Sequence, residues 1–386
     1  MIYLDHNATT PIAPRVLEAM VPYFQELWGN PSSPYRFGHR ARTAVEKARR
    51  RIADCIACRP AELVFCSSGT ESDNLALRGA VRALTSKGKH LVVSAIEHHA
   101  VLHTCKAMEK EGCPVTYVPV TADGVVDLCA LESSLRADTV LVSVMHANNE
   151  TGVVQPVDEI ARLAHERGAL FHTDAVQSAG KLDRELAKLG ADLVTFSAHK
   201  LYGPKGAAAL YVRKGTSLSP ITTGGAQELG LRAGTENVAA IVGFAEAVAL
   251  VFEGVEGEGR RQAELRNRLE QQVTSAIRGV RVNGSRALRV PNTSSLSVES
   301  VDGESIVLGL DVLGICVSTG SACSTGEPEP SHVLRAMGLP PQEAQGTIRI
   351  SLGRASGQQD IDSAVKALTE TVARLRQISS VGGGGE

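Results

Sequence analysis

The chain has 386 residues, which is more than one hydrophobic core usually serves, so length alone indicates two or three structural units. With 43% hydrophobic and 21% charged residues, the composition is that of an ordinary globular protein. The 40 basic and 42 acidic residues nearly cancel, and one Trp, six Tyr and seven Phe give few aromatic side chains. A nucleic-acid-binding protein would need a basic surface and stacking aromatics, so this class is excluded.

Membrane and secreted classes are also disfavoured. The longest apolar stretch, 238–252, contains Glu246 and is shorter than the ~20 residues that a membrane helix needs. The N-terminal residues lack the pattern of a signal peptide. Eight cysteines do not make a disulfide framework in a chain of this length, and the pair Cys55 and Cys58 lacks the second pair of a structural zinc site. We therefore expect a cytoplasmic protein with no metal site.

Short apolar runs alternate with helical patterns through the first two-thirds of the chain. The runs predict strands at 62–65, 90–95, 115–118, 139–144, 170–172, 193–196 and 207–212. Between them lie helical patterns such as 160–167, whose apolar residues share one face. This alternation predicts a parallel sheet covered by helices on both sides, with ligands at the carboxyl ends of the strands.

The composition changes near residue 253. The charged segment 253–268 predicts a long helix that links two domains. After it, strands at 293–298 and 348–352 lie among helical patterns. We expect an α/β protein with a large parallel-type domain and a smaller α+β domain.

Two polar side chains follow neighbouring strands of the predicted sheet. Asp174 and Lys200 are 200 − 174 = 26 residues apart, about one strand–helix–strand step, so we expect them at adjacent strand ends. Such a pair suits pyridoxal 5'-phosphate (PLP), because a lysine can hold its aldehyde while a carboxylate pairs with its ring nitrogen. Taken singly, Lys200 could be a solvated loop residue and Asp174 a helix N-cap.

Three further polar segments, at 67–74, 97–99 and 146–150, also follow predicted strands. The first is a turn of small residues that opens a helix, where free backbone N–H groups could bind a phosphate. Each segment alone could be structural, as a capped helix or a buried histidine. Five such segments on one sheet favour a single site.

Motifs along nearly the whole chain identify a family. They are YLDHNATTP at 3–11, GTESDN at 69–74, EH at 97–98, NNETG at 148–152, HTDAVQ at 172–177, SAHK at 197–200, RAGTEN at 232–237, GSAC at 320–323, EPSHV at 329–333 and ISLGR at 350–354. In these the chain resembles the PLP-dependent cysteine desulfurases of the aminotransferase class V family, of the nitrogen-fixation and iron–sulfur type with a long catalytic loop. The resemblance implies the fold type I of PLP-dependent transferases, with a large PLP-binding domain at 13–258 and a small domain at 1–12 and 259–386.

The resemblance also implies a role for each matching residue. Lys200 would hold PLP, Asp174 would pair with its ring nitrogen, and His98 would stack on the ring and take part in catalysis. The remaining cofactor contacts would come from Gln177 at the phenolic oxygen, from Gly69, Thr70, Ser197 and His199 at the phosphate, and from Thr235 of the second subunit of a homodimer. Asn149 and Arg354 would hold the substrate carboxylate, and Cys323 would accept sulfur.

Two of these roles have a physical basis in the sequence. Arg354 offers a planar fork that matches a carboxylate, although an arginine at a strand end could simply face solvent. Cys323 stands in the segment 318–326, which has no hydrophobic period and predicts a mobile loop with an exposed thiol. Pro328 follows and restricts the backbone of this loop.

The implied reaction converts L-cysteine to L-alanine and leaves a persulfide on Cys323, supplying sulfur to iron–sulfur clusters or other thio-cofactors. A sulfur-acceptor or iron–sulfur scaffold protein would be the partner. The alternatives are a selenocysteine lyase, another PLP enzyme of the same fold, and a non-catalytic protein that kept the fold. Retention of Lys200, Asp174 and Cys323 disfavours the last alternative. A metal site at His98, His99 and His103 is disfavoured because the HExxH pattern is missing.

Overall fold

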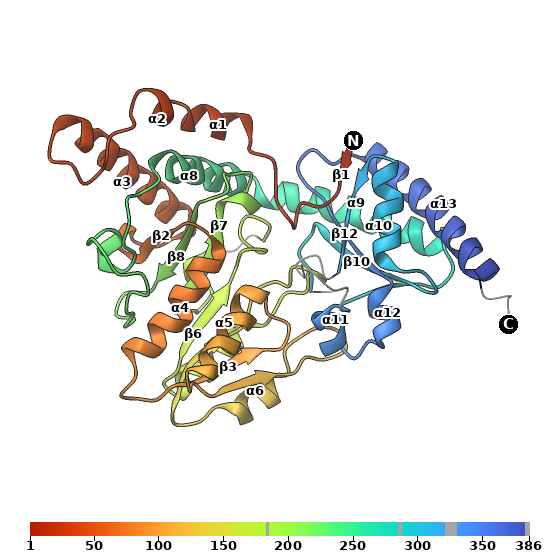
Figure 1. The fold of residues 1–386 in the computed structure, drawn as a ribbon, viewed down its shortest axis with the longest axis horizontal. Helices are drawn as coiled ribbons and strands as arrows, with labels where there is room; N and C mark the ends of the chain where they lie inside the picture. Colours follow the sequence, from red (N-terminus) through yellow and green to blue (C-terminus); the bar gives the residue numbers. More distant parts are fainter. Residues whose placement is uncertain (183–184, 285–287, 321–329, 383–386) are drawn as a thin grey trace.

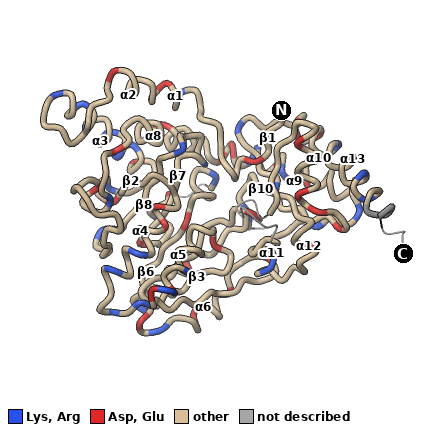
Figure 2. Tube along the Cα trace, in the orientation of Figure 1, with Lys and Arg blue, Asp and Glu red and all other residues tan. Residues whose placement is uncertain are grey.

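The computed structural model describes residues 1–182, 185–284, 288–320 and 330–382. The chain forms two units, each built on its own β-sheet, and the C-terminal helix α13 (Gln358–Gly382) lies at the outer edge of the smaller unit (Figure 1). Acidic and basic residues are interspersed over both units (Figure 2).

The larger unit contains a seven-stranded sheet. Its strands lie in the order β2 (Leu63–Cys66), β8 (Ala208–Val212), β7 (Leu193–Ser197), β6 (Leu170–Asp174), β5 (Thr139–Ser143), β3 (His90–Ser94) and β4 (Val115–Val118). The predicted strands are confirmed to within one or two residues, but the sheet is not entirely parallel. Strand β8 runs antiparallel to both of its neighbours, because a short connection rather than a crossover helix joins it to β7.

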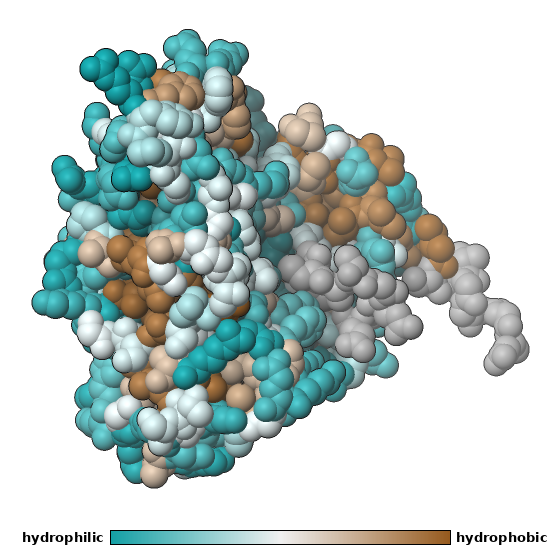
Figure 3. Space-filling model, turned by 60° about the vertical axis from the view of Figure 1, so that its left-hand side comes forward, coloured by the Kyte–Doolittle hydropathy of each residue, from teal (hydrophilic) through white to brown (hydrophobic). Residues whose placement is uncertain are grey.

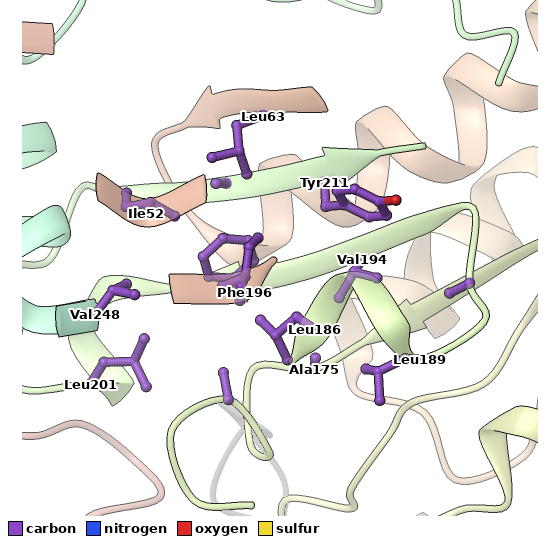
Figure 4. Close-up of a cluster of buried hydrophobic side chains, with 14 of the residues drawn as sticks. Ile52, Leu63, Ala175, Leu186, Leu189, Val194, Phe196, Leu201, Tyr211 and Val248 are labelled. Atoms are coloured by element: carbon purple, nitrogen blue, oxygen red, sulfur yellow. The ribbon is translucent and has the colours of Figure 1, made fainter. Parts of the chain in front are cut away.

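Helices cover both faces of this sheet. One face packs against α4 (Gly69–Ala83) and α5 (His99–Lys110), and the other packs against α3 (Arg36–Ile56), α7 (Val157–Glu166) and α8 (Val238–Phe252). Figure 4 shows this second core, where Ile52 of α3 and Val248 of α8 gather around Phe196 of β7. Strands buried on both faces are rich in apolar residues, as Val140, Leu141 and Val142 of β5 illustrate.

The smaller unit contains a four-stranded antiparallel sheet. Its strands lie in the order β12 (Ser318–Thr319), β13 (Thr347–Ser351), β10 (Thr293–Val298) and β9 (Val280–Val282). Helices α9 (Val255–Ala276), α10 (Gly303–Val312) and α13 form a separate hydrophobic core with this sheet. The predicted linking helix is therefore α9. Two short helices, α11 (His332–Ala336) and α12 (Pro341–Gln345), complete the unit.

The N-terminal segment contacts both units. Strand β1 (Ile2–Tyr3) pairs in parallel with β11 (Ile315–Cys316), whereas α1 (Pro14–Met20) and α2 (Pro22–Gln25) pack on α8. The chain therefore passes from the smaller unit to the larger one between residues 3 and 14. The domain bounds 13–258, with 1–12 and 259–386, remain a prediction.

None of the described helices is by itself long and apolar enough to cross a membrane. Helices α8 and α9 together meet the criteria of length and composition, but they are bent by 71° at their junction. Most residues of α8 are buried inside the larger unit.

Candidate active site

A cavity of about 280 Å³ lies at the carboxyl ends of β6 and β7. Nine of the sequence-predicted site residues line it: Gly69, Thr70, His98, Asn149, Asp174, Gln177, Ser197, His199 and Lys200. The expectation that the strand-end segments meet at one place is therefore correct for most of them. Asn7, Asp73 and Arg349 also line the cavity, and the sequence had not singled them out.

The adjacent parallel strands β6 and β7 bring Asp174 and Lys200 to the same cavity. Asp174 is the last residue of β6, and Lys200 ends the 3-10 turn Ala198–Lys200 that follows β7. The Lys200 Nζ donates to the backbone oxygen of Ala8 at 2.6 Å and to that of Asn7. Burial raises the pKa of Asp174 to about 6, against the opposing effect of Lys200, so the carboxylate is ionised above that pH. A carboxylate and an amine thus share a buried cavity.

The N-terminus of α4 forms one wall of the cavity. Ser68 caps this helix by accepting a hydrogen bond from the Glu71 N–H at 3.1 Å, and Gly69 is the first helical residue. A Cβ atom at Gly69 would lie only 3.3 Å from a methyl carbon of Val176, so a side chain there would narrow the cavity. The unpaired N–H groups of a first helical turn bind phosphate. Together with Lys200 and Asp174, this wall fits PLP.

Two histidines in the cavity wall are neutral at pH 7. Burial, with a further contribution from Lys200, lowers the pKa of His98 and of His199 to about 4 each. His98 is the N-cap of α5, and its Nδ1 accepts a hydrogen bond from the Ala100 N–H at 3.1 Å. In the neutral ring the proton therefore lies on Nε2, and this nitrogen can exchange a proton with a ligand. The Nδ1 of His199 lies 3.2 Å from Thr9 Oγ1.

Arg354 of the C-terminal motif 350–354 and the nearby Arg349 occupy different places. Arg354 is exposed, does not line this cavity, and donates from Nη1 to the backbone oxygen of Leu250 at 3.1 Å. Arg349 of β13 does line the cavity, and its side chain is only 4% exposed. It donates from Nη1 to the Asn149 backbone oxygen at 3.1 Å and from Nη2 to Asp5 Oδ1 at 2.8 Å. Its buried Nε has no hydrogen-bond partner in the described part of the chain.

Arg354, to which the resemblance assigns the substrate carboxylate, therefore lies outside this cavity and its role stays a prediction, whereas Arg349 was not among the predicted site residues. The available signal was that Arg349 interrupts an apolar strand, since a buried arginine needs a partner and so suggests a function.

Two predicted residues are not in the cavity wall. Thr235 is exposed on the surface of the larger unit, so any contact with the cofactor would have to be made from a second subunit. Cys323 lies outside the described residues. The residues that flank it are described: Gly320 lies next to the carboxylate of Glu150, and Ser331 Oγ donates to that carboxylate.

Two buried carboxyl groups belong to this region: Asp73 lines the cavity, and Glu97 precedes His98 of the cavity wall. Glu97 is fully buried, and burial raises its pKa to about 8 even though Ser94 Oγ and the Met145 N–H donate to its Oε1 at 2.6 and 2.7 Å. Burial and the nearby Asp174 raise the pKa of Asp73 well above its ordinary value. The outer oxygens, Glu97 Oε2 and Asp73 Oδ1, have no hydrogen-bond partner among the described residues. Both groups are therefore suited to hold a proton near neutral pH.

Comparison with known proteins agrees with this geometry. The model of the aminotransferase class-V family matches residues 2–364. The cysteine desulfurase IscS of Dictyoglomus turgidum is 47% identical over 378 residues, covering 98% of this chain and 96% of that protein. A cysteine desulfurase of Trichormus azollae is 46% identical over 379 residues, covering 98% of this chain and 94% of its own. A solved structure described as a NifS-like protein superposes with a TM-score of 0.91 at 38% identity, covering 97% of this chain and all of its own.

Proposed function

The chain belongs to the aminotransferase class-V family as a cysteine desulfurase, and from this premise we propose which of its residues carry the reaction. The observation that supports the proposal most strongly is the meeting of Lys200, Asp174 and the N-terminus of α4 in one cavity. Lys200 matches the aldehyde of PLP, Asp174 matches its ring nitrogen, and the N-terminus of α4 matches its phosphate.

PLP, when bound, supplies the electron sink that makes the Cα proton and the Cβ–sulfur bond of L-cysteine labile. Lys200 would hold its aldehyde, Asp174 its ring nitrogen and Gln177 its phenolic oxygen. The phosphate would lie against Gly69, Thr70, Ser197 and His199, with Thr235 of a partner subunit. His98 would stack on the ring, as the family resemblance implies.

The substrate carboxylate needs a cationic anchor inside the cavity. Arg349 meets this need better than Arg354, because its guanidinium lines the cavity and its buried Nε is free to donate. Asn149 stands beside it, since its backbone oxygen accepts from Arg349. We therefore assign the carboxylate to Arg349 and Asn149 in place of Arg354 and Asn149.

The chain's own groups then move the protons and the sulfur. Lys200 would remove the Cα proton of the substrate, and His98 would return a proton through Nε2. The Cys323 thiolate attacks the substrate sulfur, so that a sulfur–sulfur bond forms as the Cβ–sulfur bond breaks. The electron pair of the broken bond is protonated, and alanine leaves. Because only the thiolate is nucleophilic and a free cysteine has a pKa of ~8.5, the rate should rise with pH toward that value.

A homodimer is supported by the surface of the larger unit. Apolar side chains are exposed on and beside the N-terminal helices: Leu17, Phe24, Trp28 and Tyr35 are 51%, 62%, 69% and 58% exposed. Figure 3 shows apolar residues gathered mainly over the middle of the forward face, with smaller groups near its top. Such a patch on a protein surface is typical of an interface.

The segment that carries Thr235 is held to the same unit by two ion pairs. Arg49 donates to both carboxylate oxygens of the buried Glu228, and Arg232 donates to Glu71 at 2.8 Å. The ion pairs therefore fix the segment on which the exposed Thr235 lies, as a contact between Thr235 and a second subunit would require.

The product persulfide would be passed to a sulfur-acceptor or iron–sulfur scaffold protein, and we propose a cytoplasmic setting because a reducing compartment keeps a free thiol such as that of Cys323 reduced between turnovers. The test of the proposal is alanine formation by the purified protein from L-cysteine, together with its visible absorbance. Lys200→Ala should lose the PLP absorbance band and the activity. A wild-type protein that binds no PLP, or one that binds it and forms no alanine, would contradict the proposal.

A further inference from the structure

A second lysine lies close to Lys200 and takes no part in the reaction described above. Lys181, seven residues beyond the end of β6, donates from Nζ to Gln177 Oε1 at 2.7 Å and to Asn7 Oδ1 at 2.9 Å. Gln177 Nε2 in turn donates to the backbone oxygen of Asn7 at 3.0 Å. The same backbone oxygen accepts from Lys200 Nζ. Lys181 is thus connected to Lys200 through Gln177 and Asn7.

These contacts determine which way the Gln177 amide points. A lysine ammonium group only donates, so the Gln177 oxygen must face Lys181. The backbone oxygen of Asn7 only accepts, so the Gln177 NH2 group must face Asn7. If the Gln177 amide were reversed, its NH2 group would face the Lys181 ammonium group, and its oxygen would face the backbone oxygen of Asn7. The NH2 group is consequently held on the side of Lys200 and the cavity that Gln177 lines.

Lys181 works in the same way on Asn7. The Asn7 Oδ1 accepts from Lys181 and from Asn292 Nδ2 at 3.1 Å. Its Nδ2 donates to Thr293 Oγ1 at 2.8 Å and to the Asn149 backbone oxygen at 3.1 Å. The partners of Gln177 and Asn7 therefore determine the orientation of both amide groups.

The groups that face Lys181 are mainly cationic. Lys200 and Arg349 lie near enough to oppose its charge, as does His6, and Glu258 lines the small cavity that Lys181 shares with Lys200. Within the described ranges, Lys181 forms no ion pair with a carboxylate. Burial and this neighbourhood lower the pKa of Lys181 well below its ordinary value. A buried amine whose acceptors among the described residues are the neutral amide oxygens of Gln177 and Asn7 is costly to keep, which indicates a purpose other than stability.

We propose that Lys181 is a positioning residue that orients the Gln177 amide so that its NH2 group donates to the phenolic oxygen of PLP. This inference rests on the proposed function, since it assumes that Lys200 holds PLP and that Gln177 meets its phenolic oxygen. An N–H donor at that oxygen stabilises its negative charge and so lowers the pH at which the bound chromophore loses its proton. Loss of the donor raises that pH.

The experiment is a pH titration of the visible absorbance band of the PLP-bound enzyme, with Lys181→Met as the test and Lys181→Arg as the matched control. Methionine keeps the length of the side chain and offers no N–H donor, so the titration midpoint should rise by about one pH unit, the equivalent of one hydrogen bond. Arginine retains the N–H donors, and its midpoint should stay near that of the wild type. An unchanged midpoint in Lys181→Met would overturn the inference.

A double-mutant cycle separates positioning from a direct charge effect. If Lys181 acts through Gln177, the shift caused by Lys181→Met should largely disappear in a Gln177→Leu background. A shift of full size in that background would mean that the Lys181 charge acts on the cofactor directly, and it would overturn the inference. If Lys181→Met does not fold, Lys181→Gln is the substitute variant. A glutamine at position 181 allows both orientations of the Gln177 amide, so the titration midpoint should still rise. An unchanged midpoint in Lys181→Gln would overturn the inference.

Failure of the proposed function gives a different result. A wild-type protein without a visible band would contradict the PLP site itself. A normal wild-type band with an unshifted Lys181→Met midpoint would contradict only the role of Lys181.

Discussion

Replacement of Arg349 by lysine tests how the site holds its substrate. The variant keeps a positive charge near the cavity but loses the planar fork, so it cannot reach the Asn149 backbone oxygen, Asp5 and a ligand at once. A hydrogen bond to a charged group contributes roughly 1.5–3 kcal/mol, and each 1.36 kcal/mol is tenfold in rate. We therefore expect kcat/KM for L-cysteine to fall by about 10- to 150-fold.

The assay is the initial rate of alanine formation over a range of L-cysteine concentrations, and Arg354→Lys is the matched control. Arg354 is exposed, and among the described residues its side chain donates to the Leu250 backbone oxygen, which a lysine can also reach, so kcat/KM should stay near the wild-type value. The visible band of bound PLP should be unchanged in both variants, because neither arginine is assigned to the cofactor. Normal activity of Arg349→Lys with impaired Arg354→Lys would refute the reasoning and restore Arg354 as the anchor.

Three further predictions concern the ring carboxylate, a buried carboxyl group and the proposed interface. Asp174→Asn should still bind PLP but form alanine about 10- to 150-fold more slowly, since a charged hydrogen bond to the ring nitrogen is lost; wild-type rates would contradict this role. The pKa of Glu97 is raised from 4.5 to about 8, so between these values the folded protein keeps a proton that the unfolded chain loses. The contribution of this group to stability is therefore complete below pH 4.5 and is lost as pH rises toward 8. Urea titrations of the wild type and Glu97→Gln should therefore show a difference in the free energy of unfolding that changes in favour of the variant by up to ~1.4 kcal/mol per pH unit across this window. A difference that does not depend on pH would count against the raised pKa of Glu97. Trp28→Lys should shift the protein from dimer to monomer in light scattering and weaken PLP binding, whereas an intact dimer would exclude Trp28 from the interface.

Much of the fold could be predicted because apolar runs and turns mark the strands locally. Strands β4 and β10 have the predicted bounds, and Asp174 and Lys200 lie at adjacent strand ends as their spacing indicated. The direction of β8 was missed because an apolar run predicts a buried strand but not its orientation. The short connection from β7 was the available signal.

The parts of the site that could not be predicted depend on contacts between residues far apart in the chain. Arg349 directly precedes the motif that ends at Arg354, yet Arg349 lies within β13 and lines the cavity, whereas Arg354 lies beyond the end of β13 and does not. Asn7 meets Lys181 across 174 residues and Lys200 across 193 residues. No local pattern encodes such contacts, so they become visible only once the N-terminal segment is placed between the two units.

The central claim is that sulfur passes from L-cysteine to Cys323. The most direct measurement is the intact mass of the PLP-bound enzyme after a single turnover with L-cysteine, compared between the wild type and Cys323→Ser, with alanine quantified in the same samples. We expect the wild type to gain one sulfur atom that a thiol reductant removes, and Cys323→Ser to gain none and to form almost no alanine while keeping its PLP absorbance. Undiminished alanine formation by Cys323→Ser, or a sulfur atom gained on another cysteine, would contradict the account.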